Sequence, residues 1–139
     1  MEKWLLDSHV FLDYFLKSEK EKIAKDRITA IATGKTNGII STIALLEVKY
    51  RMLKKLNHDK AEEAMFLIKN MPNMEIINVD HTVAETAADM RFKYYKKNEK
   101  EMSYADAIHI ATAVVNRCSL IITGDSDFEK IDEIKTEVY

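Results

Sequence analysis

The chain has 139 residues, of which 47% are apolar, a length and composition typical of one globular domain. Its 21 basic and 23 acidic residues give a net charge of −2, which excludes an overall basic field, so a nucleic-acid ligand would need a local basic patch. The single cysteine, Cys118, excludes an intrachain disulfide, and the sequence shows neither a secretory leader nor an apolar run that would span a membrane, so we expect a cytoplasmic protein.

Short apolar runs alternate with longer helical patterns along the chain. The runs predict strands at residues 4–6, 39–41, 75–79, 120–123 and 136–138. Helical periodicity predicts helices at 10–16, 21–33, 42–53, 58–70, 81–97, 104–116 and 126–131, with a turn at Asn37–Gly38. Strands that are apolar on both faces and separated by helices are typical of a parallel sheet covered on two sides. We therefore expect one three-layer α/β domain over residues 1–139, with a mostly parallel central sheet flanked by helices.

Acidic residues stand at the ends of two predicted strands. Asp7 and Asp125 each follow an apolar strand, which puts both at the carboxyl edge of the sheet, where ligands bind in open α/β folds. Asp106 lies in the first turn of a nearly apolar helix, and Glu47 lies in the helix after the second strand. Converging carboxylates repel each other unless a cation neutralises them, and a set of oxygen ligands suits Mg²⁺ or Mn²⁺.

Asp106 also has a purely local interpretation. Ser103 and Asp106 have the spacing of a capping box, in which the carboxylate would only accept a hydrogen bond from a backbone N–H. Judged from this helix alone, capping and function are equally good predictions.

Other kinds of catalytic site are excluded by missing motifs. The sequence has no zinc-type spacing of histidines and cysteines, no phosphate-binding glycine loop and no nucleophile elbow. By elimination, we expect metal-assisted chemistry, acting on a phosphodiester.

The four acids lie in segments that recur together in a known family. The segments are residues 4–10 around Asp7, the helical Glu47, residues 102–113 around Asp106, and residues 121–128 around Asp125. In order and spacing they resemble the PIN-domain nucleases, and most closely the small VapC-type toxins of toxin–antitoxin pairs. The resemblance extends over essentially the whole chain and implies a PIN-like fold.

The resemblance implies a role for each acid. Asp7, Asp106 and Asp125 would bind one or two Mg²⁺ or Mn²⁺ ions for the hydrolysis of single-stranded RNA. Glu47 would complete the cluster, either as a ligand or through a bound water.

Neighbouring residues would support this site. The resemblance implies that Thr123 orients the carboxylates by hydrogen bonding and that Asp127 is an outer acid. After the first aspartate the family usually has Thr-Asn, whereas this chain has Ser8-His9. Ser8 keeps the hydroxyl, while His9 replaces an amide that braces the site.

Two more polar residues lie near the acids. His109 follows Asp106 by three positions on the same side of the helix, and we expect a packed or carboxylate-paired histidine in preference to a catalytic one. Asp13 is expected to face solvent on its helix, although its nearness to Asp7 keeps a role at the site open.

The resemblance further implies a homodimer and an antitoxin that threads a segment over the active-site cleft. Apolar residues of the first helices could line that groove, although core packing is the first expectation for them: Val10, Phe11, Tyr14, Phe15, Leu16, Leu45, Leu46, Leu53 and Leu56.

Two basic clusters are either solvated surface or contacts for RNA phosphates. In the second case, RNA binding would weaken steeply with salt. The clusters are Lys49, Arg51, Lys54 and Lys55, and Arg91, Lys93, Lys96, Lys97 and Lys100.

Two other functions fit part of the sequence. A PIN-like module that binds RNA or protein without cleaving would be expected to have lost some of the four acids, and all are present. A receiver-type phospho-acceptor domain also sets acids at strand ends with Mg²⁺. It would need adjacent acids after the first strand and a lysine after a late strand, whereas Ser8 follows Asp7 and Gly124 follows Thr123.

Overall fold

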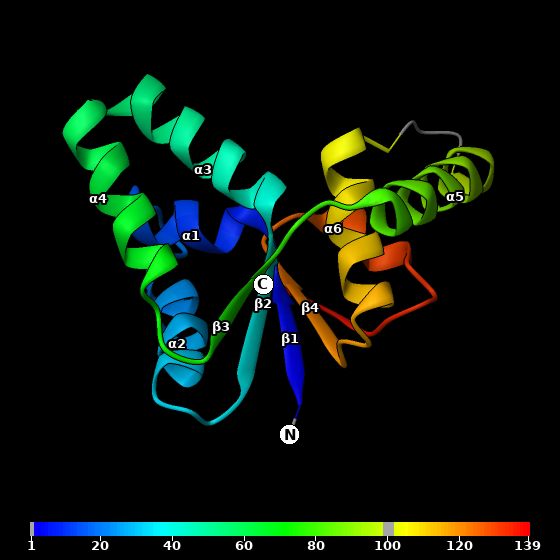
Figure 1. Cartoon of the computed structure of the whole chain (residues 1–139), viewed down its shortest axis with the longest axis horizontal. Coiled ribbons are helices and arrows are strands. Elements are labelled where there is room, and N and C mark those ends of the chain that lie inside the picture. The colour runs from blue at the N-terminus through cyan, green and yellow to red at the C-terminus, as the bar shows by residue number, and fades with distance from the viewer. Residues whose placement is uncertain (1, 99–101) are drawn as a thin grey trace.

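The fold is a five-stranded parallel sheet with helices on both faces (Figure 1). The computed structural model describes residues 2–98 and 102–139. The strand order is β3-β2-β1-β4-β5, and every neighbouring pair is parallel. The strands are β1 (Lys3–Leu6), β2 (Asn37–Ser41), β3 (Met74–Ile77), β4 (Leu120–Thr123) and β5 (Thr136–Val138). The expected α/β class is confirmed.

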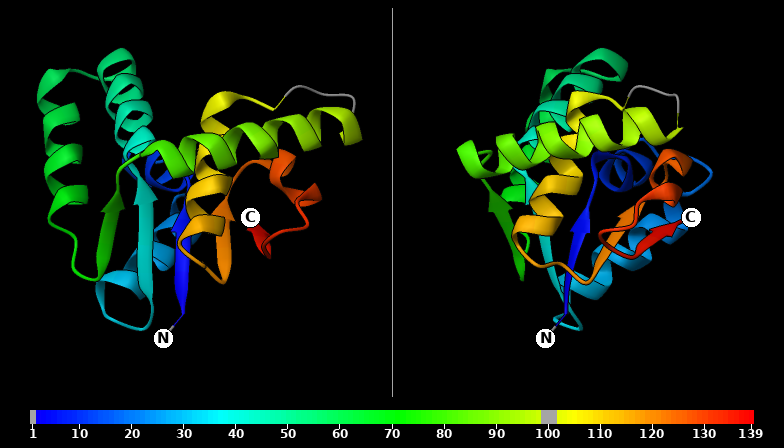
Figure 2. Two further views of the ribbon diagram at one scale, coloured as in Figure 1. Left: turned by 45° about the vertical axis from the view of Figure 1, so that its right-hand side comes forward. Right: turned by 90° about the vertical axis from the view of Figure 1, so that its right-hand side faces the viewer.

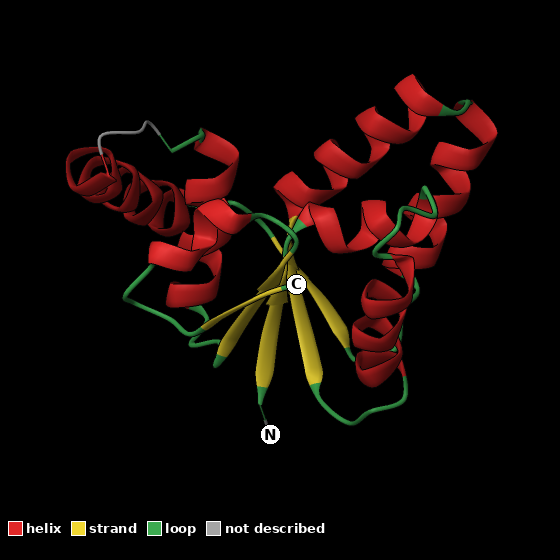
Figure 3. Cartoon of the chain, turned by 180° about the vertical axis from the view of Figure 1, so that it is seen from behind, coloured by secondary structure: helices red, strands yellow, loops and turns green. Residues whose placement is uncertain are grey.

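The helices form two groups that cover opposite faces of the sheet (Figure 3). One group is α1 (Ser8–Phe15), α2 (Glu21–Ala32), α3 (Thr42–Lys55) and α4 (His58–Lys69). On the other face α6 (Tyr104–Val115) lies against the sheet and packs with α5 (His81–Asn98), as Figure 2 shows. A short 3₁₀ helix, η1 (Ser126–Lys130), joins β4 to β5.

No helix within the described ranges is long and apolar enough to cross a membrane.

The alternation of side chains along each strand builds two separate cores. Leu6, Ile40 and Ile122 point to the side of α1–α4 and pack in one buried cluster. Their strand neighbours Leu5, Ile39 and Ile121 point to the opposite side, where they pack with Ile110 of α6. Apolar residues on both faces of each central strand are therefore what the two helical layers require.

The predicted turn at Asn37–Gly38 is wrong, because both residues belong to β2. A Cβ atom at Gly38 would lie 2.6 Å from Cδ1 of Ile31 and 2.9 Å from Cε of Met74. The glycine thus permits close packing of α2 and β3 against the strand instead of forming a turn. Elsewhere the differences are at element ends: β3 ends at Ile77, two residues before the predicted end, and α1 begins at Ser8.

Candidate functional site

The centre of the site is the carboxyl edge of the two adjacent strands β1 and β4. Leu6 pairs with Ile122, so the residues that follow them, Asp7 and Thr123, are neighbours across the strands. Asp7 is only 1% exposed, and the Thr123 hydroxyl donates a short hydrogen bond to its Oδ2. The same Thr123 oxygen accepts the backbone N–H of Asp125 at 2.9 Å. Thr123 therefore connects two of the predicted acids.

Asp125 and Asp127 form a local turn at the start of η1. The Oδ1 atom of Asp125 accepts the backbone N–H of Asp127 at 2.9 Å and caps the helix. Asp127 itself is exposed. The capping contact directs the Asp125 side chain toward the helix while its backbone stays bound to Thr123.

Asp106 enters the same cluster from α6. Ser103 caps this helix by accepting the Asp106 backbone N–H at 3.1 Å, so the capping role belongs to the serine side chain. Burial raises the pKa of Asp106 to about 6, and the negative charges of Asp125 and Asp7 add to the shift. The Ser103 part of the predicted capping box is therefore present, and the Asp106 carboxylate lies in addition within electrostatic reach of the other two acids.

His9 supplies a positive charge inside this cluster. Its Nδ1 lies 3.3 Å from Oδ2 of Asp7, and its side chain is 47% exposed. The hydrogen bond to Asp7 raises the pKa of His9 to about 9, with further contributions from the charges of Asp7, Asp125 and Asp106 that outweigh burial. At neutral pH this imidazole is protonated. From the sequence, His9 is predicted only to replace an amide. Its position two residues after Asp7, which caps α1, is the sequence feature that indicates a contact between the two side chains.

Glu47 is hydrogen-bonded to a histidine of another helix. Its Oε1 accepts from Nε2 of His109 at 2.7 Å, which confirms the carboxylate-paired interpretation of that residue. Burial alone would raise the pKa of Glu47, but hydrogen bonds from His109 and Ser8, together with the charge of His9, lower it below its ordinary value. Ser8 is itself buried. Glu47 is therefore ionised and linked to the cluster through Ser8 and His9.

The chemistry of these residues fits a divalent cation. Asp7, Asp106 and Asp125 provide oxygen ligands whose mutual repulsion a cation would relieve. Across residues 2–98 and 102–139, however, no three His, Cys, Asp or Glu side chains form a ready-made metal cage. Protein donors at Thr123 and His9 hold Asp7, so coordination by several acids requires side-chain movement.

Asp13 does not face solvent as expected. It is partly buried and accepts hydrogen bonds from Oγ of Ser18 at 2.8 Å and from the hydroxyl of Tyr139 at 2.7 Å. A Cβ atom at Gly124 would lie 3.2 Å from Oδ2 of Asp13 and 3.4 Å from the Tyr139 ring. These residues therefore pack against the backbone that leads to Asp125, and sequence reasoning missed Tyr139.

Several residues of the basic clusters have protein partners. Lys49 pairs with Glu62 at 3.0 Å, and Lys93 pairs with Glu133 at 2.6 Å. Arg91 donates to the carbonyl of Met102 and packs over the ring of Tyr104. On α3, Arg51, Lys54 and Lys55 are exposed. The side chains of Lys96, Lys97 and Lys100 lie outside the described residues.

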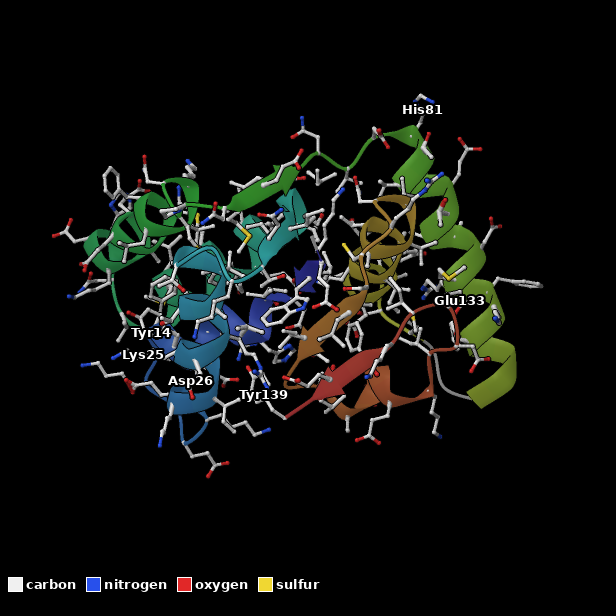
Figure 4. The ribbon with its side chains drawn as sticks, turned by 90° about the horizontal axis from the view of Figure 1, so that it is seen from below. Tyr14, Lys25, Asp26, His81, Glu133 and Tyr139 are labelled. Carbon is white, nitrogen blue, oxygen red and sulfur yellow. The ribbon has the colours of Figure 1, made fainter. Side chains whose placement is uncertain are left out.

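A groove of about 560 Å³ lies between the ends of α1 and α3 and the neighbouring helices. Tyr14 of α1 and Lys25 of α2 lie close together beside it (Figure 4). Apolar and charged side chains line the groove together. The apolar ones include Tyr14, Phe15, Leu16, Met52, Leu56 and Leu67, and the charged ones include Lys17 and Lys60. Part of the apolar set thus lines a groove, while Val10 and Phe11 belong to the core.

Comparison with solved structures finds VapC toxins and toxin–antitoxin complexes over nearly the whole chain. VapBC2 from Rickettsia felis, bound to a promoter DNA fragment, has 15% identity and a TM-score of 0.79, covering 98% of each chain. VapC20 from Mycobacterium tuberculosis, a toxin that cleaves the sarcin–ricin loop, has 16% identity and a TM-score of 0.73, covering 94% of this chain and 98% of that one. A toxin–antitoxin complex from Klebsiella pneumoniae has 26% identity and a TM-score of 0.65, covering 94% and 93%.

Comparison of the sequence with curated proteins gave no match. The family model of the PIN domain, in contrast, matches residues 4–134, a range that includes all four predicted acids. Because this model spans most of the sequence, the chain belongs to the PIN-domain family.

Proposed function

We propose that the chain is a metal-dependent endoribonuclease that hydrolyses RNA phosphodiester bonds and acts as the toxin of a type II toxin–antitoxin pair. One observation carries the proposal: in a PIN domain, two carboxylates that follow adjacent strands at the carboxyl edge of the sheet lie within electrostatic reach of a third on α6. Asp7, Asp106 and Asp125 lie near enough for the first and third to raise the pKa of the second. Such a concentration of negative charge is costly without a cation.

In this proposal Asp7, Asp106, Asp125 and Glu47 hold Mg²⁺ or Mn²⁺ in a single nuclease domain. When bound, the ion supplies positive charge that activates water and stabilises the phosphate oxygens. Thr123 fixes the Asp7 carboxylate and the Asp125 backbone relative to each other. A carboxylate that does not bind the ion accepts the proton of the attacking water.

The supporting residues contact the four acids rather than the ion. Ser8 donates to Glu47 and helps to keep it ionised. Asp127 fixes the Asp125 carboxylate through its backbone N–H and supplies an outer acid. His9 balances part of the negative charge before a cation enters, because it is protonated at neutral pH.

The structural relatives support an antitoxin partner for this chain. Several of them are complexes of a VapC toxin with its antitoxin. The groove beside Tyr14, Leu56 and Leu67 has the apolar lining that an antitoxin segment needs. We further propose that the chain acts in the cytoplasm as a homodimer, as the resemblance to VapC toxins implies.

Cleavage of a mixed RNA pool tests the nuclease proposal. The purified protein, freed of any bound inhibitor, should cut with Mg²⁺ or Mn²⁺ and stop cutting in EDTA. Asp106→Asn should reduce cleavage at least about 100-fold because it removes a ligand charge. The matched control Asp26→Asn, at an exposed position on α2, should cut like the wild type. Equal cleavage by a folded Asp106→Asn variant would refute the assignment.

A further inference from the structure

His109 is a buried polar residue in an otherwise apolar stretch of α6. The residue is 1% exposed, and Ile110 and Ala111 beside it are fully buried. Its Nδ1 atom is buried and has no hydrogen-bond partner within residues 2–98 and 102–139. An unpaired ring nitrogen in the core costs free energy that an apolar side chain would avoid. Packing alone therefore gives no reason for a histidine at this position.

The other ring nitrogen makes one short contact, to Glu47. The Nε2–Oε1 distance is 2.7 Å, and because an ionised carboxylate only accepts, the proton lies on Nε2. The Glu47 side chain is 28% exposed, so it remains partly accessible to solvent while Oε1 is hydrogen-bonded to His109. The pair connects α3 to α6 across 62 positions of sequence.

The contact also relates Glu47 to the acid cluster. Asp106 and His109 are three positions apart on α6 and lie on the same side of the helix. His109 is near enough to Asp106 for its charge to act on that carboxyl group. A hydrogen bond from His109 therefore restricts where the Glu47 carboxylate lies relative to Asp106.

We propose that His109 is a positioning residue for the metal centre: it donates from Nε2 to Glu47 and holds this carboxylate on the side of α6 that carries Asp106. The inference rests on the proposed function, because it takes Glu47 as part of the metal centre. Residues that orient ligands in this way typically change metal affinity by about 10- to 100-fold when they are removed. The unpaired Nδ1 is the structural cost of keeping the donor in place.

Mn²⁺ binding by the full chain tests the proposal without any assay of cleavage. After EDTA treatment and dialysis, Mn²⁺ affinity is measured by calorimetry for the wild type and for His109→Leu, which replaces the ring with an apolar side chain. His109→Gln is the conservative variant because it retains an N–H donor. Glu47→Gln and the double variant His109→Leu/Glu47→Gln complete a double-mutant cycle. Thr112→Val is the packing control, because Thr112 is equally buried on α6 and its hydroxyl donates to the Ile108 carbonyl rather than to any of the acids.

We expect His109→Leu and Glu47→Gln each to weaken Mn²⁺ binding by about 10-fold or more. The double variant should bind no more weakly than Glu47→Gln alone, because His109 acts only through that carboxylate. His109→Gln should stay within about 3-fold of the wild type, and Thr112→Val should not change the affinity. The melting temperature of metal-free His109→Leu should change little, because the loss of the hydrogen bond to Glu47 is offset by removal of an unpaired buried nitrogen.

Three results would overturn the inference. Wild-type affinity in a folded His109→Leu variant would show that the histidine does not position a ligand. Strictly additive losses in the double variant would show that it acts independently of Glu47. Wild-type affinity in Glu47→Gln would remove Glu47 from the metal centre. If the wild type itself binds no Mn²⁺, the proposed function fails together with the inference, whereas the first three results leave a nuclease centred on the aspartates intact.

Discussion

At the scale of single residues, the carboxylates of Asp7 and Asp106 have different hydrogen-bond partners and neighbouring charges. Asp7 is fixed by several contacts: its N–H donates to the Ile122 carbonyl at 3.2 Å, and its carboxylate accepts from the His9 N–H at 3.0 Å and from Thr123. Asp106 has the Ser103 hydroxyl nearby but also faces two negative charges, and its pKa is raised to about 6. In the metal-free protein, burial and these two charges therefore disfavour the ionised form of Asp106.

Removing this charge should stabilise the metal-free fold. The pKa of Asp106 is raised from 3.8 to about 6, so the folded state holds the proton more tightly than the unfolded chain, and stability falls as pH rises between these values. Asp106→Asn should therefore increase the free energy of unfolding by about 1 to 2 kcal/mol at pH 7.5 in EDTA, and by much less at pH 4. Urea denaturation at both pH values measures the difference.

The control for this prediction is Asp26→Asn, which should stay within about 0.5 kcal/mol of the wild type at pH 7.5. An Asp106→Asn variant that is less stable than the wild type at pH 7.5 without metal would contradict the electrostatic account. Because the same variant is expected to lose cleavage, a gain in stability also separates loss of function from loss of fold.

The positions of single residues could be predicted from the sequence where neighbouring residues in the chain determine them. Asp7 follows β1 directly and Asp125 follows β4 after Gly124, and the direction of a parallel sheet places their backbones at one edge. The partners of side chains far apart in sequence could not be predicted. Glu47 and His109 are 62 positions apart, and nothing near either residue specifies the other. The pKa of His9 is raised first by its local hydrogen bond to Asp7, and only the smaller contributions come from Asp125 and Asp106, which the fold brings close.

At the scale of elements, β5 and α1 are joined beside the site by Tyr139. The backbone N–H of Tyr139 donates to the Thr123 carbonyl at 3.1 Å, and its hydroxyl donates to Asp13 of α1 at 2.7 Å. Lys20 donates to the Tyr139 carbonyl at 3.1 Å. Burial raises the pKa of the Tyr139 hydroxyl above its ordinary value, and the hydrogen bond to Asp13 adds to this shift. The phenol therefore remains a donor to a partly buried carboxylate.

Tyr139→Phe should weaken this connection. Loss of the hydroxyl leaves Asp13 with one donor fewer, so we expect the free energy of unfolding to fall by about 1 kcal/mol. Tyr95→Phe, at an exposed position on α5, is the matched control and should change stability by less than about 0.5 kcal/mol. Equal stability of both variants in chemical denaturation would show that the Asp13 contact contributes nothing.

The elements themselves were predictable because each apolar run or helical period is a local property of the sequence. All five strands and the predicted helices are present, with differences of a few residues at their ends. The prediction of a turn at Asn37–Gly38 is wrong because it depended only on the residue types, and both residues lie in β2. The absence of a side chain at Gly38 lets Ile31 and Met74 pack closely against the strand. The need for a glycine is therefore visible only once α2 and β3 are packed against β2.

At the scale of the whole molecule, two helical layers cover the sheet and leave its carboxyl edge for the acids. The layers lie on opposite sides of the strands in Figure 1, and the acids come from both of them and from the strand ends. Structural similarity persists at 15% identity to the Rickettsia felis chain, so the fold itself tolerates wide sequence change. Function must therefore be argued from the side chains at that edge rather than from the architecture.

Anomalous diffraction from crystals grown with Mn²⁺ tests the central claim most directly, because it locates the ion without any assumption about activity. The account predicts a Mn²⁺ peak bounded by the carboxylates of Asp7, Asp106 and Asp125, with Glu47 as a ligand or one water away. Oxygen ligands should lie at distances appropriate to a hard divalent cation. A fully occupied Mn²⁺ elsewhere on the molecule, with Asp7 still bound to Thr123 and His9, Asp125 to the Asp127 N–H and Glu47 to His109, would contradict it.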